Sequence, residues 1–65
     1  MWVARDKNGS IWAYVDKPDK DMEYGGWTPK DSYYMPLNDT DYPEVSWDDE
    51  EPAELIVKRE NGKEN

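Results

Sequence analysis

The side chains able to do chemistry in this chain are almost all carboxylates. Its 65 residues include 16 Asp and Glu, but no His and no Cys. Paired carboxylates can serve as acid and base in glycoside hydrolysis, but that chemistry needs a pocket that raises the pKa of one of them. A chain this short leaves little volume for a cavity of a few hundred Å³, and nothing places a base beside its Ser, Lys or Tyr residues. We therefore expect no catalytic residues and no enzymatic activity.

One acidic segment begins like a calcium-binding loop. Residues 19–23 carry acidic side chains at alternating positions, but Tyr24 stands where an EF-hand requires Gly and Lys30 where it requires Glu. The acidic run at residues 48–51 would attract a divalent cation only weakly, and it is typical of a solvated loop that blocks edge pairing. We therefore expect neither a metal ion nor a cofactor.

Aromatic side chains are the second distinctive feature. The chain has four Trp and five Tyr but no Phe, and only eight residues are Leu, Ile or Val. Each ring can bury about 150–250 Å², so in one interpretation the rings form the core. In the other, some of them form an exposed platform that stacks on a peptide, a sugar or a base. The aromatic residues expected to anchor a partner are Trp12, Tyr14 and Trp47.

The net charge of −8 indicates which partners are favourable. It repels nucleic-acid phosphates and anionic membrane surfaces, so we expect a basic host protein instead, with no nucleic acid and no membrane among the partners. The residues expected to steer this partner are Asp48, Asp49, Glu50 and Glu51. Two alternatives remain: a DNA mimic that inhibits a host defence protein, and a small saccharide-binding module. No apolar run approaches the roughly 20 residues of a membrane span, so we expect a cytoplasmic protein. We expect it to be a monomer or a weak dimer.

Short strands must position these side chains, and the clearest is a hairpin at the start of the chain. Residues 1–5 and 10–16 favour strands, and the intervening Asp6-Lys7-Asn8-Gly9 is typical of a three-residue loop whose Gly has positive φ. The expected register pairs Asp6 with Ser10, Arg5 with Ile11, Val3 with Ala13 and Trp2 with Tyr14. This register places the aliphatic side chains on one face and the aromatic ones on the other, and either face could be the buried one.

The rest of the chain predicts a small all-β domain over residues 1–59 with a disordered tail at 60–65. The remaining predicted segments are a charged loop at 17–21, a turn at Gly25-Gly26 followed by Trp27-Thr28, a strand that begins with residues 32–35 and ends at Pro36 or Leu37, an extended piece at 44–47 and a last strand at 53–59. For the last strand a helix is the alternative, because Glu54 and Lys58 are four residues apart. We expect a twisted antiparallel sheet or open barrel of four to five strands, with room for one short helical turn near residues 39–43.

Two stretches of the chain resemble a family of short uncharacterised proteins from phages, prophages and mobile elements of bacteria, often gut bacteria. The stretches are Trp2-Val3-Ala4-Arg5-Asp6-Lys7-Asn8-Gly9-Ser10 and Pro43-Glu44-Val45-Ser46-Trp47-Asp48-Asp49-Glu50-Glu51-Pro52, with Lys17-Pro18 between them. The resemblance extends from Trp2 to about Leu55 and implies a compact stand-alone domain of mobile-element type, with no catalytic residues to carry over. Together with the residues themselves, it favours a non-catalytic module that binds another protein.

Overall fold

The structure, a computed structural model, describes residues 1–55 and is built from strands and turns. The strands are β1 (Trp2–Arg5), β2 (Ile11–Tyr14), β3 (Asp19–Asp21), β4 (Gly26–Thr28), β5 (Tyr34–Pro36) and β6 (Ala53–Glu54). None of the described residues is helical, so the all-β prediction is confirmed. The predicted last strand begins as β6, while its residues 56–59 and the predicted tail at 60–65 lie outside the described residues.

The first hairpin has the predicted register. β1 and β2 pair Trp2 with Tyr14, Val3 with Ala13 and Arg5 with Ile11. The loop closes through two backbone hydrogen bonds, from Asp6 N to Ser10 O at 2.7 Å and from Gly9 N to Asp6 O at 3.0 Å. Gly9 has a φ of +98°, a conformation that side chains beyond glycine rarely adopt. Local turn chemistry therefore sets the register of the whole hairpin.

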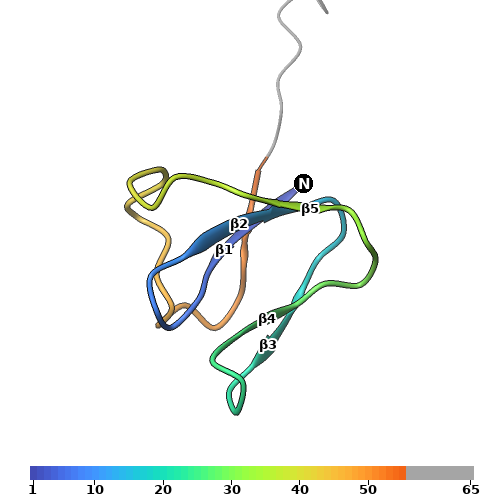
Figure 1. The fold of residues 1–65 in the computed structure, drawn as a ribbon, viewed down its shortest axis with the longest axis horizontal. Helices are drawn as coiled ribbons and strands as arrows, with labels where there is room; N and C mark the ends of the chain where they lie inside the picture. The colour runs from blue at the N-terminus through green and yellow to red at the C-terminus, as the bar shows by residue number, and fades with distance from the viewer. Residues whose placement is uncertain (56–65) are drawn as a thin grey trace, which may run out of the picture.

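Four strands form an antiparallel sheet in the order β5-β2-β1-β6 (Figure 1). The sheet is not closed into a barrel, because β5 and β6 are its two outer strands. β5 begins two residues later than predicted and ends at Pro36, one of the two predicted ends. Pro36 lies opposite Trp12 on an outer strand, which is where a residue without a backbone N–H is tolerated.

The segment predicted as a charged loop at 17–21 contains a strand instead, so that prediction was wrong. β3 pairs with β4 as a second, two-stranded sheet (Figure 1). Its turn is tight, because the Asp21 carboxylate accepts hydrogen bonds from the backbone N–H groups of Glu23 and Tyr24, and Gly25 takes a φ of +83°. A low strand propensity is overridden here by this turn and by the tertiary contacts of Lys20 described below.

Both faces of the first hairpin are buried. On the aliphatic face Val3, Ile11 and Val45 form a cluster, with Leu37, Tyr42, Ala53 and Leu55 packed against it. On the aromatic face Ala4, Tyr14 and Trp27 form a second cluster, with Trp2, Trp12 and Trp47 packed against it. The aromatic rings thus form the core on one face of the hairpin, and aliphatic side chains form most of the core on the other face.

One side chain ties the long irregular segment between β5 and β6 to the sheet. The guanidinium group of Arg5 donates five hydrogen bonds to backbone carbonyls and, within residues 1–55, none to a carboxylate. The acceptors are the carbonyl oxygens of Gly9, Asp39, Asp41, Tyr42 and Val45, at 2.7–3.2 Å. Arg5 therefore satisfies the polar backbone of a segment that has no ladder of its own.

Turns replace two elements that were expected in this segment. Asp41 N donates to Asn38 O at 2.9 Å, so residues 39–43 contain a hydrogen-bonded turn and no helix. The piece at 44–47, predicted to be extended, also consists of turns, because Tyr42 has a φ of +53° and its carbonyl accepts the Val45 N–H. The Arg5 hydrogen bonds stabilise this compact path of the backbone relative to an extended one.

Candidate functional site

The exposed apolar side chains gather along β5. Seven large hydrophobic residues are exposed among the described residues, and five of them line one groove of about 280 Å³. These five, Met1, Val15, Tyr33, Tyr34 and Met35, line what we call the apolar groove, together with Ala13, Tyr14 and Ser32. Met35 lies opposite Ala13 in the register, so the groove follows the aliphatic face of the sheet at its outer edge.

The opposite face of the β2–β5 pair carries a second hollow, which we call the aromatic cavity. It also measures about 280 Å³ and is lined by Asp6, Trp12, Tyr14, Tyr24, Trp27, Thr28, Pro29 and Tyr34. Tyr34 lies opposite Tyr14 across the β2–β5 pair, which places both on the aromatic face. The ring of Tyr34 meets that of Trp12 edge-on with centroids 5.9 Å apart, and that of Tyr14 at a tilt of 31°. A chain of 65 residues therefore holds hollows that its length did not lead us to expect.

The β3–β4 hairpin supplies the other wall of the aromatic cavity. It is docked on β1, because the indole Nε1 of Trp27 donates to Arg5 O at 2.9 Å and Lys7 N donates to Gly25 O at 3.0 Å. A Cβ on Gly26 would lie 2.9 Å from the ring of Tyr24 and 3.1 Å from Asp6 Oδ1. Only glycine therefore lets these two side chains lie against the strand at this point.

Asp6 is the one carboxylate in the lining of the aromatic cavity. Its Oδ1 atom is buried and has no hydrogen-bond partner within residues 1–55. Burial raises the pKa of Asp6, and the nearby Trp12 indole and Trp27 backbone act in the opposite direction without reversing the effect. Burial also raises the pKa of Tyr14 to about 12, with the charge of Asp6 contributing. The cavity thus combines electron-rich rings with a carboxylate that has one buried oxygen without a hydrogen-bond partner.

Two further carboxylates lie close together near the end of the apolar groove. The pKa of Asp16, which directly follows Val15 of the groove, is raised by a hydrogen bond that its protonated carboxyl donates to Asp31 and by the negative charge of Asp31. The pKa of Asp31 is lowered, first by the backbone N–H of Tyr33, which donates to Asp31 Oδ1 at 2.9 Å, and then by Asp16. The charges of Lys30 and of the N-terminal amine partly offset this increase, so the rim carries both acidic and basic groups with two carboxyls at its centre.

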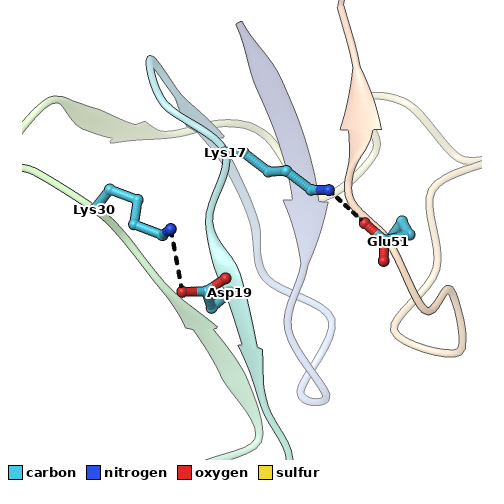
Figure 2. Close-up of polar contacts among 4 residues, drawn as sticks. All are labelled: Lys17, Asp19, Lys30 and Glu51. Carbon is cyan, nitrogen blue, oxygen red and sulfur yellow. Dashed lines mark ion pairs between the residues drawn. The ribbon is translucent and has the colours of Figure 1, made fainter.

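The acidic run expected to steer a partner is partly engaged within the molecule. Glu51 forms an ion pair with Lys17 at 2.7 Å (Figure 2), and Asp49 Oδ2 accepts the Ser46 N–H at 3.0 Å. The side chains of Asp48 and Glu50 are exposed and have no hydrogen bond or ion pair within the described part of the chain. Two of the four predicted steering residues therefore help to shape a turn and to tie it to the neighbouring loop.

Lys20 holds this turn from the other side. Its ammonium group donates to the backbone carbonyls of Trp47 and Asp49, and it lies 4.3 Å from the ring centroid of Trp47 and 5.7 Å from that of Trp27. The second ion pair in Figure 2, between Lys30 and Asp19 at 3.5 Å, links the ends of the β3–β4 hairpin. The contacts of Lys20 with this turn thus explain how β3, which consists of three charged residues, packs against the rest of the domain.

The three predicted aromatic anchors belong to one cluster but have different surroundings. Trp12 is half-buried and lines the aromatic cavity, whereas Tyr14 is only 4% exposed and is a core residue. Trp47 packs edge-on against Trp27 with centroids 6.3 Å apart and lies outside that cavity. The sequence reasoning missed Asp6, Tyr34 and the residues of the apolar groove. The alternation along Ser32–Met35 was the available signal, but it does not reveal that this strand pairs with β2.

The described residues contain no group of three or more side chains suited to hold a metal ion. The same residues form no helix that is long and apolar enough to cross a membrane. No family model, curated protein or solved structure matches this chain significantly.

Proposed function

We propose that this protein is a non-catalytic interaction module that binds an extended segment of a basic host protein along β5. The observation that carries this proposal is the gathering of exposed apolar side chains in the apolar groove. Tyr33 is 69% and Met35 57% exposed, and contiguous apolar surface of this kind is typical of protein-binding sites. We further propose that it acts in the cytoplasm as a protein of mobile-element type, in line with the sequence resemblance.

The edge of β5 supports an extended partner. Tyr33 and Leu37 exchange backbone hydrogen bonds with β2, since Val15 N donates to Tyr33 O at 3.1 Å and Leu37 N to Ile11 O at 2.9 Å. By alternation, the backbone of Tyr34 and the carbonyl of Pro36 face away from β2. β5 pairs with no other strand in residues 1–55. A segment added here would gain main-chain hydrogen bonds to Tyr34 and place alternate side chains on the two faces.

Charge supports a basic partner. The net charge of the chain is −8, and the close carboxylates of Asp16 and Asp31 lie at the rim of the apolar groove. Surface potential of this sign accelerates encounter with a positively charged protein and loses its effect as salt is added. Apolar contacts would then provide most of the affinity and the carboxylates the approach and orientation.

A display library of random linear peptides tests the proposal, because it samples many candidate partner segments at once. Peptides selected on the wild type are expected to combine apolar and basic residues and to lose about tenfold or more in affinity to Met35→Ser, because burial of a methionine side chain is worth about 1.5–3 kcal/mol. Met22→Ser is the matched control, since Met22 is 71% exposed in the β3–β4 turn and outside the groove.

Four outcomes would contradict the proposal. Equal losses with both methionine variants would remove the apolar groove from the interface. A dimer in light scattering that Met35→Ser dissociates would make a second copy of the chain the occupant. Salt-sensitive binding to a nucleic-acid-binding protein that is insensitive to Met35→Ser would favour DNA mimicry, and a glycan-dependent shift of Trp fluorescence would favour the saccharide module.

A further inference from the structure

We propose that the aromatic cavity binds a basic side chain of the partner protein, a guanidinium or ammonium group that carries N–H donors. The inference rests on the proposed function, because it names the chemistry by which the partner would be recognised on the second face of β5. It can be tested without the partner.

The walls of the cavity suit an organic cation. Five aromatic residues line it, and three of their rings, those of Trp12, Tyr14 and Tyr34, meet at different angles instead of stacking flat on one another. The electron-rich faces of such rings attract a cation within about 6 Å of a ring centroid. A volume of about 280 Å³ admits one long side chain and not a large ligand.

The molecule already uses the same chemistry once. Lys20 lies within reach of the rings of Trp27 and Trp47 and gives its N–H groups to two backbone carbonyls. Those hydrogen bonds commit Lys20 to the turn after Trp47, and no lysine or arginine is among the residues that line the aromatic cavity. Within residues 1–55, the cavity therefore has the walls of a cation site but no internal cation among its lining residues.

Asp6 supplies the negative charge that the rings alone lack. It takes part in no ion pair among the described residues, and its buried Oδ1 atom has no hydrogen-bond donor. A buried carboxylate oxygen without a hydrogen-bond donor is costly, and the cost is reduced when a cation with N–H groups enters the cavity beside it. A cation with N–H groups can donate a hydrogen bond to the carboxylate and also contact the ring faces, whereas a quaternary ammonium can only contact the ring faces.

The position of the cavity agrees with the extended segment proposed above. The apolar groove and the aromatic cavity lie on opposite faces of the β2–β5 pair, and Tyr34 lines both. Successive side chains of a strand point to opposite faces. A segment along the edge of β5 would therefore place an apolar side chain in the groove and the neighbouring basic side chain in the cavity.

The test is a titration of the uniformly ¹⁵N-labelled protein with Nα-acetyl-arginine amide, observed at the Trp indole N–H signals. The neutral isostere Nα-acetyl-citrulline amide is the ligand control. We expect the indole signals of Trp12 and Trp27 to move, and the arginine derivative to bind about tenfold more tightly than the citrulline derivative, because only the cation forms a charge-assisted hydrogen bond and a cation–π contact.

Asp6→Asn keeps the shape of the side chain and removes its charge, so it should weaken the arginine derivative about tenfold. Asp48→Asn makes the same change of charge on an exposed side chain outside the cavity and should alter binding by less than about twofold. Wild-type dispersion of the amide signals in both variants would show that the fold is kept.

Several results would overturn the inference. Equal binding of the arginine and citrulline derivatives would mean that the cavity does not recognise the positive charge, and no movement of the two indole signals would mean that neither probe enters it. Two further probes are Nα-acetyl-trimethyl-lysine amide and free agmatine. If the trimethyl-lysine probe binds more tightly than the arginine derivative, the N–H donors have no role, and if agmatine does, the ligand is a small-molecule amine and not a protein side chain. Because these probes do not depend on the apolar groove, their failure would leave the Met35→Ser result standing as a separate test of the proposed function.

Discussion

Replacement of Arg5 by Ala is expected to unfold much of this protein. The guanidinium group donates five hydrogen bonds to backbone carbonyls, four of them in the segment at 39–45 and one, Gly9, in the loop of the first hairpin. Each such bond contributes a net amount of about 0.5–1.5 kcal/mol, and carbonyls left unpaired add to the cost. We therefore expect a loss of about 3–5 kcal/mol, against a total stability of roughly 3–10 kcal/mol for a domain of this length.

The measurement is urea denaturation followed by Trp fluorescence, with the free energy of unfolding obtained by linear extrapolation. Arg5→Lys keeps the charge but has a single ammonium group that cannot reach five acceptors, so it should lose about half as much stability. Lys7→Ala is the matched control, because it removes an equal charge from an exposed side chain of the same hairpin. A loss with Arg5→Ala no larger than that of the control would refute the structural role assigned to the five hydrogen bonds.

Three further predictions follow from single side chains. Lys20→Met should lower the free energy of unfolding by about 1–3 kcal/mol and shift Trp fluorescence, since it removes two carbonyl contacts and the cation over Trp47; Lys30→Met, which breaks only an exposed ion pair, should change it by less than about 1 kcal/mol. The Asp6→Asn variant should be more stable than the wild type at pH 7 and nearly equal to it at pH 3. The pKa of Asp6 is raised above its ordinary value of 3.8 in the folded state, so ionisation of this carboxyl destabilises the fold as the pH rises through that range. Urea denaturation at both pH values tests the sign. Lys17→Met should cost less than about 1 kcal/mol in thermal denaturation, with the difference shrinking as salt is added, because both partners of its ion pair are more than half exposed.

The parts of the fold that could be predicted are those set by neighbours in sequence. The register of the first hairpin followed from Asp6-Lys7-Asn8-Gly9, because a turn with a glycine at positive φ leaves one way to pair the flanking strands. β3 could not be predicted in the same way. Three charged residues have a low strand propensity, and the contacts that hold Lys20 come from a turn 27 and 29 residues further along the chain.

The candidate site was predicted only in its residue types. Trp12 and Tyr14 were rightly placed on one face of the hairpin, but their exposure depended on what would cover that face. The sequence indicated only a turn residue at Asp6. Its Oδ1 atom is buried because β4 docks on β1 through the Trp27 indole, which the local sequence does not reveal. The apolar groove needed β5 to pair with β2, which is a contact between residues far apart in the chain.

The sequence by itself determined the strand-rich character of the chain, its acidic surface and which hairpin residues share a face, because alternation and turn chemistry act over a few residues. The tertiary structure decided that both faces are covered and that the side chains along β5 are left exposed. Alternation sorts side chains into two sets but carries no information about the layer that will lie over each set. That layer is chosen by long-range contacts such as the hydrogen bonds of Arg5 and Trp27.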